Sequence, residues 1–160
     1  MRPAATIPPA ESALRRHAES VVSECRYLVL ATSTLSGTPW ATPVYFATTP
    51  RWTFWWVSSP DSRHSRNIAV NPHVALTVFD SSVEVGEASA VYADARAEEC
   101  APREAAEIGT YSARSQAHGA APWTADMVTG EAEFRLYRAR ASAVWLLRPR
   151  GPDLRVQVYP

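Results

Sequence analysis

Hydrophobic positions recur with helical spacing near the start of the chain. Between Glu11 and Cys25 the apolar residues fall at i, i+4, i+7, i+8 and i+11, namely Leu14, Ala18, Val21, Val22 and Cys25. This spacing places them on one face of a helix. Before it, residues 1–9 contain three prolines and little that can pack, so we expect a flexible arm there and one domain over 10–160.

Short apolar runs bounded by turn residues follow this helix and predict β-strands. We expect strands over residues 27–32, 38–47, 51–58, 74–79 and 83–93. The strand over 51–58 carries four aromatic residues and should form a hairpin with the strand before it. A short helix is expected over 62–70, ended by Asn71-Pro72 because proline disfavours a helical residue before it.

The sequence after residue 97 predicts a helix, a loop and then strands. Residues 98–115 are rich in Ala, Glu and Arg and predict a helix. The loop over 116–130 is either a lid over a bound ligand or a plain connector, and we favour the connector. Two closing strands are expected over 134–140 and 142–147. Several short strands with peripheral helices predict an α+β fold centred on a β-barrel.

Composition and charge exclude several classes of function. The formal net charge is zero, from 16 basic and 16 acidic residues, so no overall field favours nucleic acid or an anionic membrane. All 16 basic residues are arginine. Without lysine the chain cannot form an internal Schiff base, and it cannot supply the lysine of a phosphate-binding P-loop.

The cysteines and histidines show no ligand spacing typical of a metal site. Cys25 and Cys100 lie far apart without a CxxC motif, so we expect two buried free thiols and no metal. No run approaches 18 apolar residues, and the first ten residues lack the apolar stretch of a signal peptide. We therefore expect a cytoplasmic protein that does not span a membrane.

The segment from Trp56 to Leu76 places hydroxyl groups, an arginine and a histidine where a strand leads into a helix. Free amides at a helix N-terminus attract phosphate, and serine hydroxyls and an arginine add donors. The alternative is that Asp61 or Ser62 only caps the helix, while Arg63 and Arg66 are solvated. The residues by themselves leave both interpretations open.

Four segments together resemble a known family. In order they are TPVYFA, TFWWVSSPDSRHSRNI, NPHVALTVF and VEVGEASAV. They are similar to the flavin-binding split barrels of the pyridoxamine 5'-phosphate oxidase-like family, over about residues 27–95. The resemblance implies an antiparallel six-stranded split β-barrel with peripheral helices. It also implies that Ser62, Arg63 and His64, which stand where the family has Ser-Arg-Lys, bind the phosphate of FMN.

The resemblance assigns further contacts residue by residue. Histidine in place of lysine at position 64 makes the positive charge depend on pH. The strand residues Thr42, Pro43 and Val44 correspond to the segment whose backbone lines the isoalloxazine edge, while Val57 and Ser58 correspond to the strand end beside ring and phosphate. Trp56 is the candidate aromatic near the ring because it precedes them. Two further positions are also considered: Ser81-Ser82, where the family often has glutamine, and Trp145, a candidate partner-subunit tryptophan.

The resemblance therefore implies an FMN-dependent oxidoreductase that forms a homodimer, with the cofactor at the subunit interface and a small-molecule substrate. The cofactor performs the redox chemistry, so no catalytic residue is named. The alternatives are a reductase that uses the deazaflavin F-420, or a protein that binds flavin or haem without turnover. Oxidation of pyridoxamine 5'-phosphate itself is not expected, because the chain end RPRGPDLRVQVYP lacks a clear substrate-binding Arg and His pattern.

Overall fold

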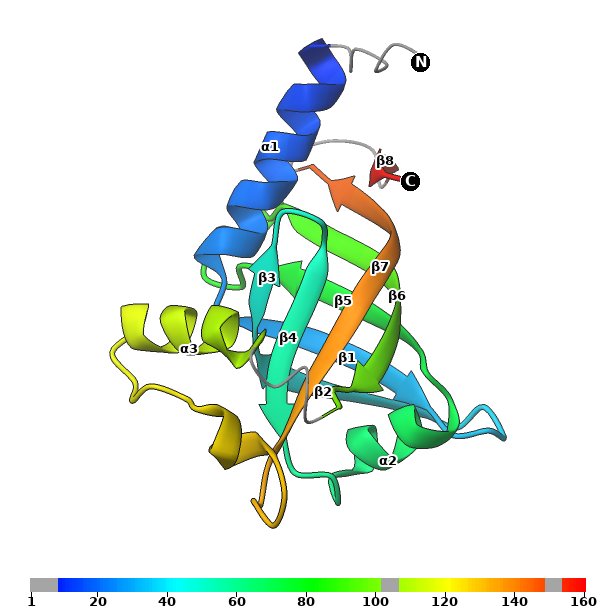
Figure 1. Ribbon diagram of the computed structural model, residues 1–160. Helices are drawn as coiled ribbons and strands as arrows, with labels where there is room; N and C mark the ends of the chain where they lie inside the picture. Colours follow the sequence, from blue (N-terminus) through cyan, green and yellow to red (C-terminus); the bar gives the residue numbers. More distant parts are fainter. Residues whose placement is uncertain (1–8, 102–106, 149–153) are drawn as a thin grey trace, which may run out of the picture.

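The computed structural model describes residues 9–101, 107–148 and 154–160. These residues form one antiparallel sheet of eight strands with three α-helices and a 3-10 helix, η2 (Figure 1). Along the chain the elements are α1 (Pro9–Glu24), β1 (Tyr27–Ser33), β2 (Pro39–Tyr45), β3 (Ala47–Thr49), β4 (Thr53–Ser58), α2 (Arg63–Val70), β5 (His73–Phe79), β6 (Ala90–Glu99), α3 (Ile108–Ala117), η2 (Ala125–Val128), β7 (Arg135–Leu147) and β8 (Arg155–Tyr159). The predicted α+β antiparallel split-barrel class is confirmed, although the described residues contain eight strands rather than six.

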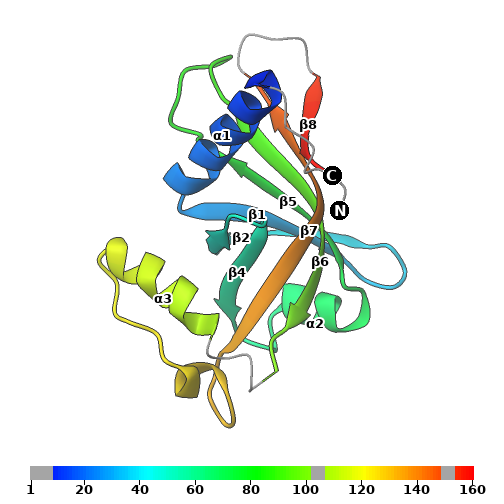
Figure 2. The same ribbon diagram turned by 45° about the horizontal axis from the view of Figure 1, so that its top comes forward.

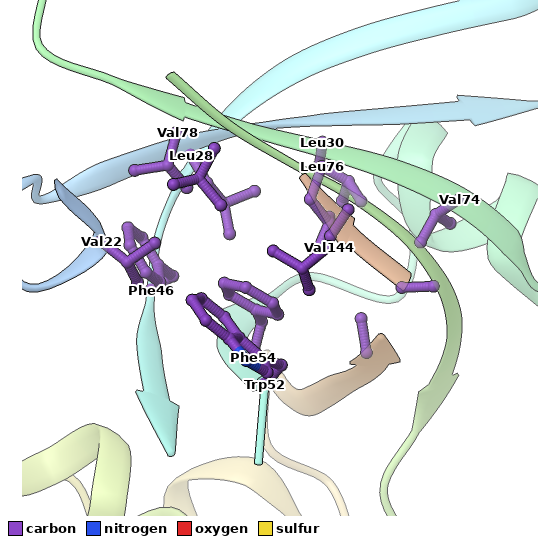
Figure 3. Close-up of a cluster of buried hydrophobic side chains, with 14 of the residues drawn as sticks. Val22, Leu28, Leu30, Phe46, Trp52, Phe54, Val74, Leu76, Val78 and Val144 are labelled. Carbon is purple, nitrogen blue, oxygen red and sulfur yellow. The ribbon is translucent and has the colours of Figure 1, made fainter. Parts of the chain in front are cut away.

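The sheet curls around one hydrophobic core. Its strand order is β2-β1-β5-β6-β7-β4-β3, with β8 paired to β7. Side chains that alternate along the strands point inward and meet in the middle (Figure 3). The labelled members of this core are Val22, Leu28, Leu30, Phe46, Trp52, Phe54, Val74, Leu76, Val78 and Val144. Helix α1 closes one end of the curled sheet and α2 lies at the other (Figure 1).

A second, smaller cluster lies outside the barrel against β3 and β4. It includes Trp55 from β4, Tyr111 and Ile108 from α3, and Val128 from η2. In Figure 2, α3 and the segment after it lie beside β4 and away from the core side of the sheet. The aromatic residues of β4 therefore pack on both faces of their strand within the protomer. Trp52, Phe54, Trp55 and Trp56 are all buried, so a dimer is not required to cover them.

Several predicted elements are confirmed with small changes in their ends. These are the helix at 11–25, the strands at 27–32 and 74–79, and the short helix that ends at Val70. The prediction of one strand over 38–47 is wrong in one respect, because the chain divides there at Phe46 into two strands, β2 and β3. Strand β2 pairs with β1, whereas β3 forms the hairpin with β4. The amide of Phe46 donates to the carbonyl of Arg26 at this corner, 3.4 Å apart.

The region from 83 to 115 departs most from the sequence expectation. Val83 and Val85 alternate like a strand but are exposed in a turn region, and strand β6 begins only at Ala90. Strand β6 then continues to Glu99, where the predicted helix was expected to have begun. The part of that helix over 102–106 lies outside the described residues, and α3 begins at Ile108. Pairing with β7 explains the difference, since it holds the acidic end of β6 extended.

The end of the chain also differs from the prediction. The two closing strands are one strand, β7, which bends at an irregularity in its pairing with β6 between Asp94 and Ala95. Strand β8 was not predicted, and it extends the sheet beyond β7. Neither Cys25 nor Cys100 forms a disulfide with the described residues; Cys100 is buried, as expected of both thiols, whereas Cys25 is only half-buried. The predicted arm over 1–9 lies outside the described residues except for Pro9, which starts α1.

Candidate functional site

The candidate site lies where β4 leads through a tight turn into α2. The amide of Asp61 donates to Ser59 Oγ at 3.2 Å, and the amide of Ser62 donates to the carbonyl of Ser59 at 3.1 Å. Ser62 is extended (φ −65°, ψ 151°) and its Oγ accepts from the amide of Ser65 at 3.3 Å. This is the usual geometry of a helix N-cap. The capping role that the sequence left open for Ser62 is thus confirmed.

Ser58, Ser62 and His64 form what we call the Ser–His cluster. The Nε2 atom of His64 lies 2.9 Å from Ser58 Oγ and 3.1 Å from Ser62 Oγ. Ser62 Oγ also donates to Ser65 Oγ at 2.8 Å, which leaves its proton engaged within the helix. The structure therefore brings together three of the predicted phosphate ligands. Of the two cluster hydroxyls, that of Ser58 is the more available donor.

His64 is almost fully buried, with 9% of its surface exposed. Burial lowers the pKa of this imidazole from its ordinary value of 6.5, because the charged form is poorly solvated there. At neutral pH the ring is therefore neutral in the ligand-free protein, unlike the lysine it replaces. A neutral imidazole still offers one N–H donor. A bound dianion beside it would shift the balance towards the protonated ring.

We expect the protein to lose stability as the pH falls below about 6.5. The unfolded chain binds a proton at His64 more readily than the folded chain, so acid favours unfolding. Urea unfolding at a series of pH values should show this dependence, and His64→Gln should reduce it. His118, whose pKa is also lowered by burial, accounts for part of the pH dependence that remains in this variant. A slope that is unchanged in His64→Gln would contradict the assignment.

Arg63 does not extend freely into solvent. Its guanidinium carbon lies 4.4 Å from the centre of the Trp40 ring, which stands on the exposed part of β2. The cation–π contact connects the first residue of α2 to β2. Arg66, three residues on, instead donates to the carbonyl of Asp61. Sequence reasoning missed Trp40, because nothing local indicates that residues 40 and 63 meet.

The first turn of α2 also presents its own backbone donors. The amides of Arg63 and His64 have no acceptor among the residues that the structure describes. They lie at the positive end of the helix dipole. Two backbone amides and the Ser58 hydroxyl therefore lie near one end of the helix, and the Arg63 side chain extends from its first turn to Trp40. This donor set is suited to a phosphate group.

The side-chain amides of Asn67, which is buried, and Asn71, which is half-buried, anchor α2 to the sheet beneath it. Asn67 Nδ2 donates to Thr32 Oγ1 at 3.0 Å, and Asn71 Nδ2 donates to Ser33 Oγ at 3.0 Å. Thr32 and Ser33 are the last residues of β1, so the helix is fixed to the strand that neighbours β2. Sequence reasoning did not select these residues, and their only signal is asparagine on the inner side of a short helix. They hold the site rather than line it.

The predicted ring-edge residues lie on β2, at one end of the sheet order. Pro43 points outward and is exposed, Thr42 is half-buried, and Val44 points into the core with 7% exposed. One edge of β2 pairs with β1 along its whole length. Among the described residues no strand is hydrogen-bonded to the other edge, so its backbone groups remain available.

Trp56 does not line the site. Its side chain is fully buried and stacks on Tyr137 with the ring centres 5.7 Å apart and the planes at 13°. Burial raises the pKa of Tyr137 to about 12, and its hydroxyl donates to Glu99 Oε2 at 3.3 Å. Val57, the next predicted residue, is half-buried on the opposite face of β4. The indole thus supports the strand from inside the barrel.

The remaining predicted positions lie far from the Ser–His cluster. Ser58 pairs with Arg135 at the start of β7, and Trp145 stands ten residues further along the same strand. Ten residues of strand span about 33 Å, so only a partner's Trp145 could approach the site. Ser81 lies beside Cys25 in a pocket at the start of β1, at the other end of that strand from Ser33. Ser82 donates to Asp80 and caps the turn there.

The loop over 116–130 is anchored to the protein rather than hinged over the cluster. The amide of Trp123 donates to Ser112 Oγ at 2.8 Å, and the Trp123 ring packs between Tyr111 and Phe134. The amides of His118, Gly119 and Ala120 donate to carbonyls of α3. These contacts support the connector interpretation.

No group of three or more His, Cys, Asp or Glu side chains in the described residues is arranged to hold a metal ion. No described helix combines the length and the hydropathy needed to cross a membrane.

Comparison with known proteins identifies what the chain is similar to. The family model described as pyridoxamine 5'-phosphate oxidase matches residues 14–148. No curated protein matches the chain. Among solved structures, HutZ, a haem storage protein from Vibrio cholerae, is 19% identical with a TM-score of 0.65, over 85% of this chain and 94% of that one.

Two further solved structures share the fold at similarly low identity. An FAD-binding protein from Mesorhizobium loti is 20% identical with a TM-score of 0.62, over 82% of this chain and 91% of that one. A protein described as an F420 reductase is 20% identical with a TM-score of 0.59, over 79% of this chain and 94% of that one. At these identities the likeness establishes a shared fold, and it leaves the ligand of this chain undecided.

Proposed function

The chain belongs to the pyridoxamine 5'-phosphate oxidase family, and from that premise we propose that it is an FMN-binding oxidoreductase. We further propose that residues 10–160 form a single domain and that two copies pair, with the cofactor between them. Bound FMN would supply the redox chemistry by accepting and passing on electrons. The protein's own task is then to bind and orient the cofactor.

The donor set at the start of α2 is the observation that carries this proposal. It joins the Ser58 hydroxyl, the Arg63 guanidinium and the first amides of the helix, with His64 held against Ser58. Each hydrogen bond to a charged group contributes about 1.5–3 kcal/mol, so three or four would retain a phosphorylated ligand at micromolar affinity. Ser62 contributes indirectly, since it caps the helix that presents these donors.

Pairing of two copies has support from apolar side chains that remain exposed. Two such side chains outside the pocket between β1, β2 and α3 are Trp40 on β2 and Phe79 on β5. Exposed apolar patches often mark protein interfaces. A partner lying along β2 would also cover its open edge, where Thr42, Pro43 and Val44 are proposed to face the isoalloxazine edge. The aromatic residues of β4 give no support, because they are buried within the protomer.

The Ser62-Arg63-His64 sequence favours FMN over the two alternatives. It keeps the Ser-Arg pair with which FMN-binding members hold the phosphate, and the structure places that pair at a helix N-terminus. The alternatives remain a reductase that uses deazaflavin F-420, or a protein that stores flavin or haem without turnover. No residue is proposed as a catalytic acid or base, and the substrate class beyond a small molecule is not proposed.

Titration of the purified protein with FMN tests the proposal directly. We expect quenching of flavin fluorescence at one FMN per chain and a bound spectrum with a maximum at about 450 nm. Riboflavin, which lacks the phosphate, is the matched control and should bind about tenfold to a hundredfold more weakly. Equal binding of FMN and riboflavin would contradict the phosphate site. A protein that ignores FMN but gains a Soret band with haem would replace the proposal with the haem alternative.

A further inference from the structure

A pocket of about 320 Å³ lies between the start of β1, the end of β2 and the C-terminal end of α3. Figure 2 shows α3 beside β2 and β4. Its lining includes Arg26, Tyr27, Tyr45, Tyr111, His118 and Trp123. None of these residues belongs to the Ser–His cluster. The size is at the lower end of the range for small-molecule sites.

The aromatic rings of the pocket form a continuous edge-to-face series. The Tyr27 and Tyr45 ring centres are 6.0 Å apart, those of Tyr45 and Tyr111 5.5 Å, and those of Tyr111 and Trp123 5.8 Å. Tyr111 is buried and forms the base, whereas Tyr45 and Trp123 are half-buried and Tyr27 is 60% exposed. Part of the ring surface of Tyr27, Tyr45 and Trp123 therefore remains open to solvent. Such surface is suited to a planar aromatic ligand.

The charge of the pocket is positive. Arg26 is exposed and forms no ion pair with the described residues. Arg114, which lies close by, is already engaged, because its Nη2 donates to the carbonyls of Val22, Ser23 and Cys25 at the end of α1. No carboxylate lines the pocket. The guanidinium of Arg26 is thus a cation available to a ligand.

Tyr45 and His118 add a directed hydrogen bond. Tyr45 Oη and His118 Nδ1 are 2.8 Å apart. Burial raises the pKa of Tyr45, whereas burial, Arg114 and Arg26 together lower the pKa of His118. At neutral pH the phenol therefore donates to a neutral imidazole, whose remaining proton is on Nε2. Arg26 and His118 thus offer the pocket one cation and one N–H donor, and both favour an anionic ligand.

We propose that this pocket is a second binding site of the protein, which takes a planar aromatic carboxylate of one or two rings. The rings of Tyr27, Tyr45 and Trp123 contact the aromatic body, and Arg26 pairs with the carboxylate. The pocket contains none of the proposed phosphate-binding residues, although Tyr45 directly follows Val44 on β2. Tyr45 and Trp40 stand five residues apart on β2, about 17 Å at the rise of a strand.

Isothermal titration with 2-naphthoate tests the proposal, with the neutral 2-naphthamide as the matched probe. We expect 2-naphthoate to bind the wild-type protein about tenfold more tightly than the amide. Arg26→Gln should remove this preference and leave the amide unchanged. Arg51→Gln, which alters another exposed arginine in the turn between β3 and β4, should change neither. Tyr27→Leu should weaken both probes, because it removes a ring and no charge.

Three results would overturn the site. One is the absence of saturable binding up to about 5 mM 2-naphthoate. This concentration is well above the dissociation constant expected of a two-ring ligand. Another is equal 2-naphthoate affinity in the wild type and Arg26→Gln. The third is displacement of 2-naphthoate by riboflavin and FMN alike, which would place the probe in a flavin site. Binding of 2-naphthoate by a protein that ignores FMN would support the pocket and contradict only the proposed function.

Discussion

Replacing Arg63 by glutamine is expected to weaken FMN binding by about tenfold to a hundredfold. The substitution removes the charged donor of the phosphate site and the stacking of the guanidinium on Trp40. Glutamine retains one amide donor but cannot bind a phosphate through two parallel charged bonds. Titration followed by flavin fluorescence measures the change, and riboflavin affinity should stay unchanged because it carries no phosphate.

Arg66→Gln is the matched control for this prediction. Arg66 is also an exposed arginine of α2, but its guanidinium donates to the carbonyl of Asp61 rather than stacking on Trp40. We expect this variant to bind FMN as the wild type does. An equal loss of affinity in both variants would indicate a general effect of positive charge on the helix, and an unchanged affinity in Arg63→Gln would remove the arginine from the site.

Replacing Trp56 by alanine should lower the free energy of unfolding by about 3–5 kcal/mol. The indole is fully buried in the core and stacks on Tyr137, its pairing partner on β7, so its loss leaves a cavity there. A domain of this size is stable by about 5–15 kcal/mol, so the change is a large share of the total. Urea unfolding followed by tryptophan fluorescence or circular dichroism measures it.

Trp56→Phe separates a packing role from a ligand contact. The indole nitrogen of Trp56 has no hydrogen-bond partner among the described residues, so phenylalanine loses no polar contact. We expect this variant to remain folded and to bind FMN within about twofold of the wild type. A folded Trp56→Phe protein with strongly reduced FMN affinity would show instead that the indole contacts the ligand, as the sequence first indicated.

Local signals were sufficient for the start of the candidate site. A serine that follows a Ser-Pro-Asp turn and precedes a helical stretch predicts an N-cap, and Ser62 is that cap. The adjacent Arg63 and His64 were placed at the first turn for the same reason. The proline after Asn71 likewise marked the end of the helix. These features depend on backbone sterics and hydrogen bonds within a few residues, so they are visible in a single sequence.

Other features could not be read locally. The alternation of Val83 and Val85 is typical of a strand, yet within the described part of the chain no strand pairs with them, and both are exposed. Conversely, Glu98 and Glu99 have little strand propensity but are extended, because β7 pairs with them and Arg138 binds Glu98 at 2.8 Å. Strand formation depends on the partner strand more than on the residues themselves.

The sequence by itself determined the fold class, the short helix with its serine cap, the absence of lysine chemistry and the family to which the chain is similar. The tertiary structure alone decided which side chains meet. It placed Arg63 on Trp40, buried Trp56 in the core, held His64 between two hydroxyls and packed Tyr27, Tyr111 and His118 around Tyr45. Each of these contacts joins residues whose proximity or burial is set by the curl and register of the sheet. A pattern of hydrophobic positions specifies which face of a strand is buried, but it carries no information on which distant residue lies opposite.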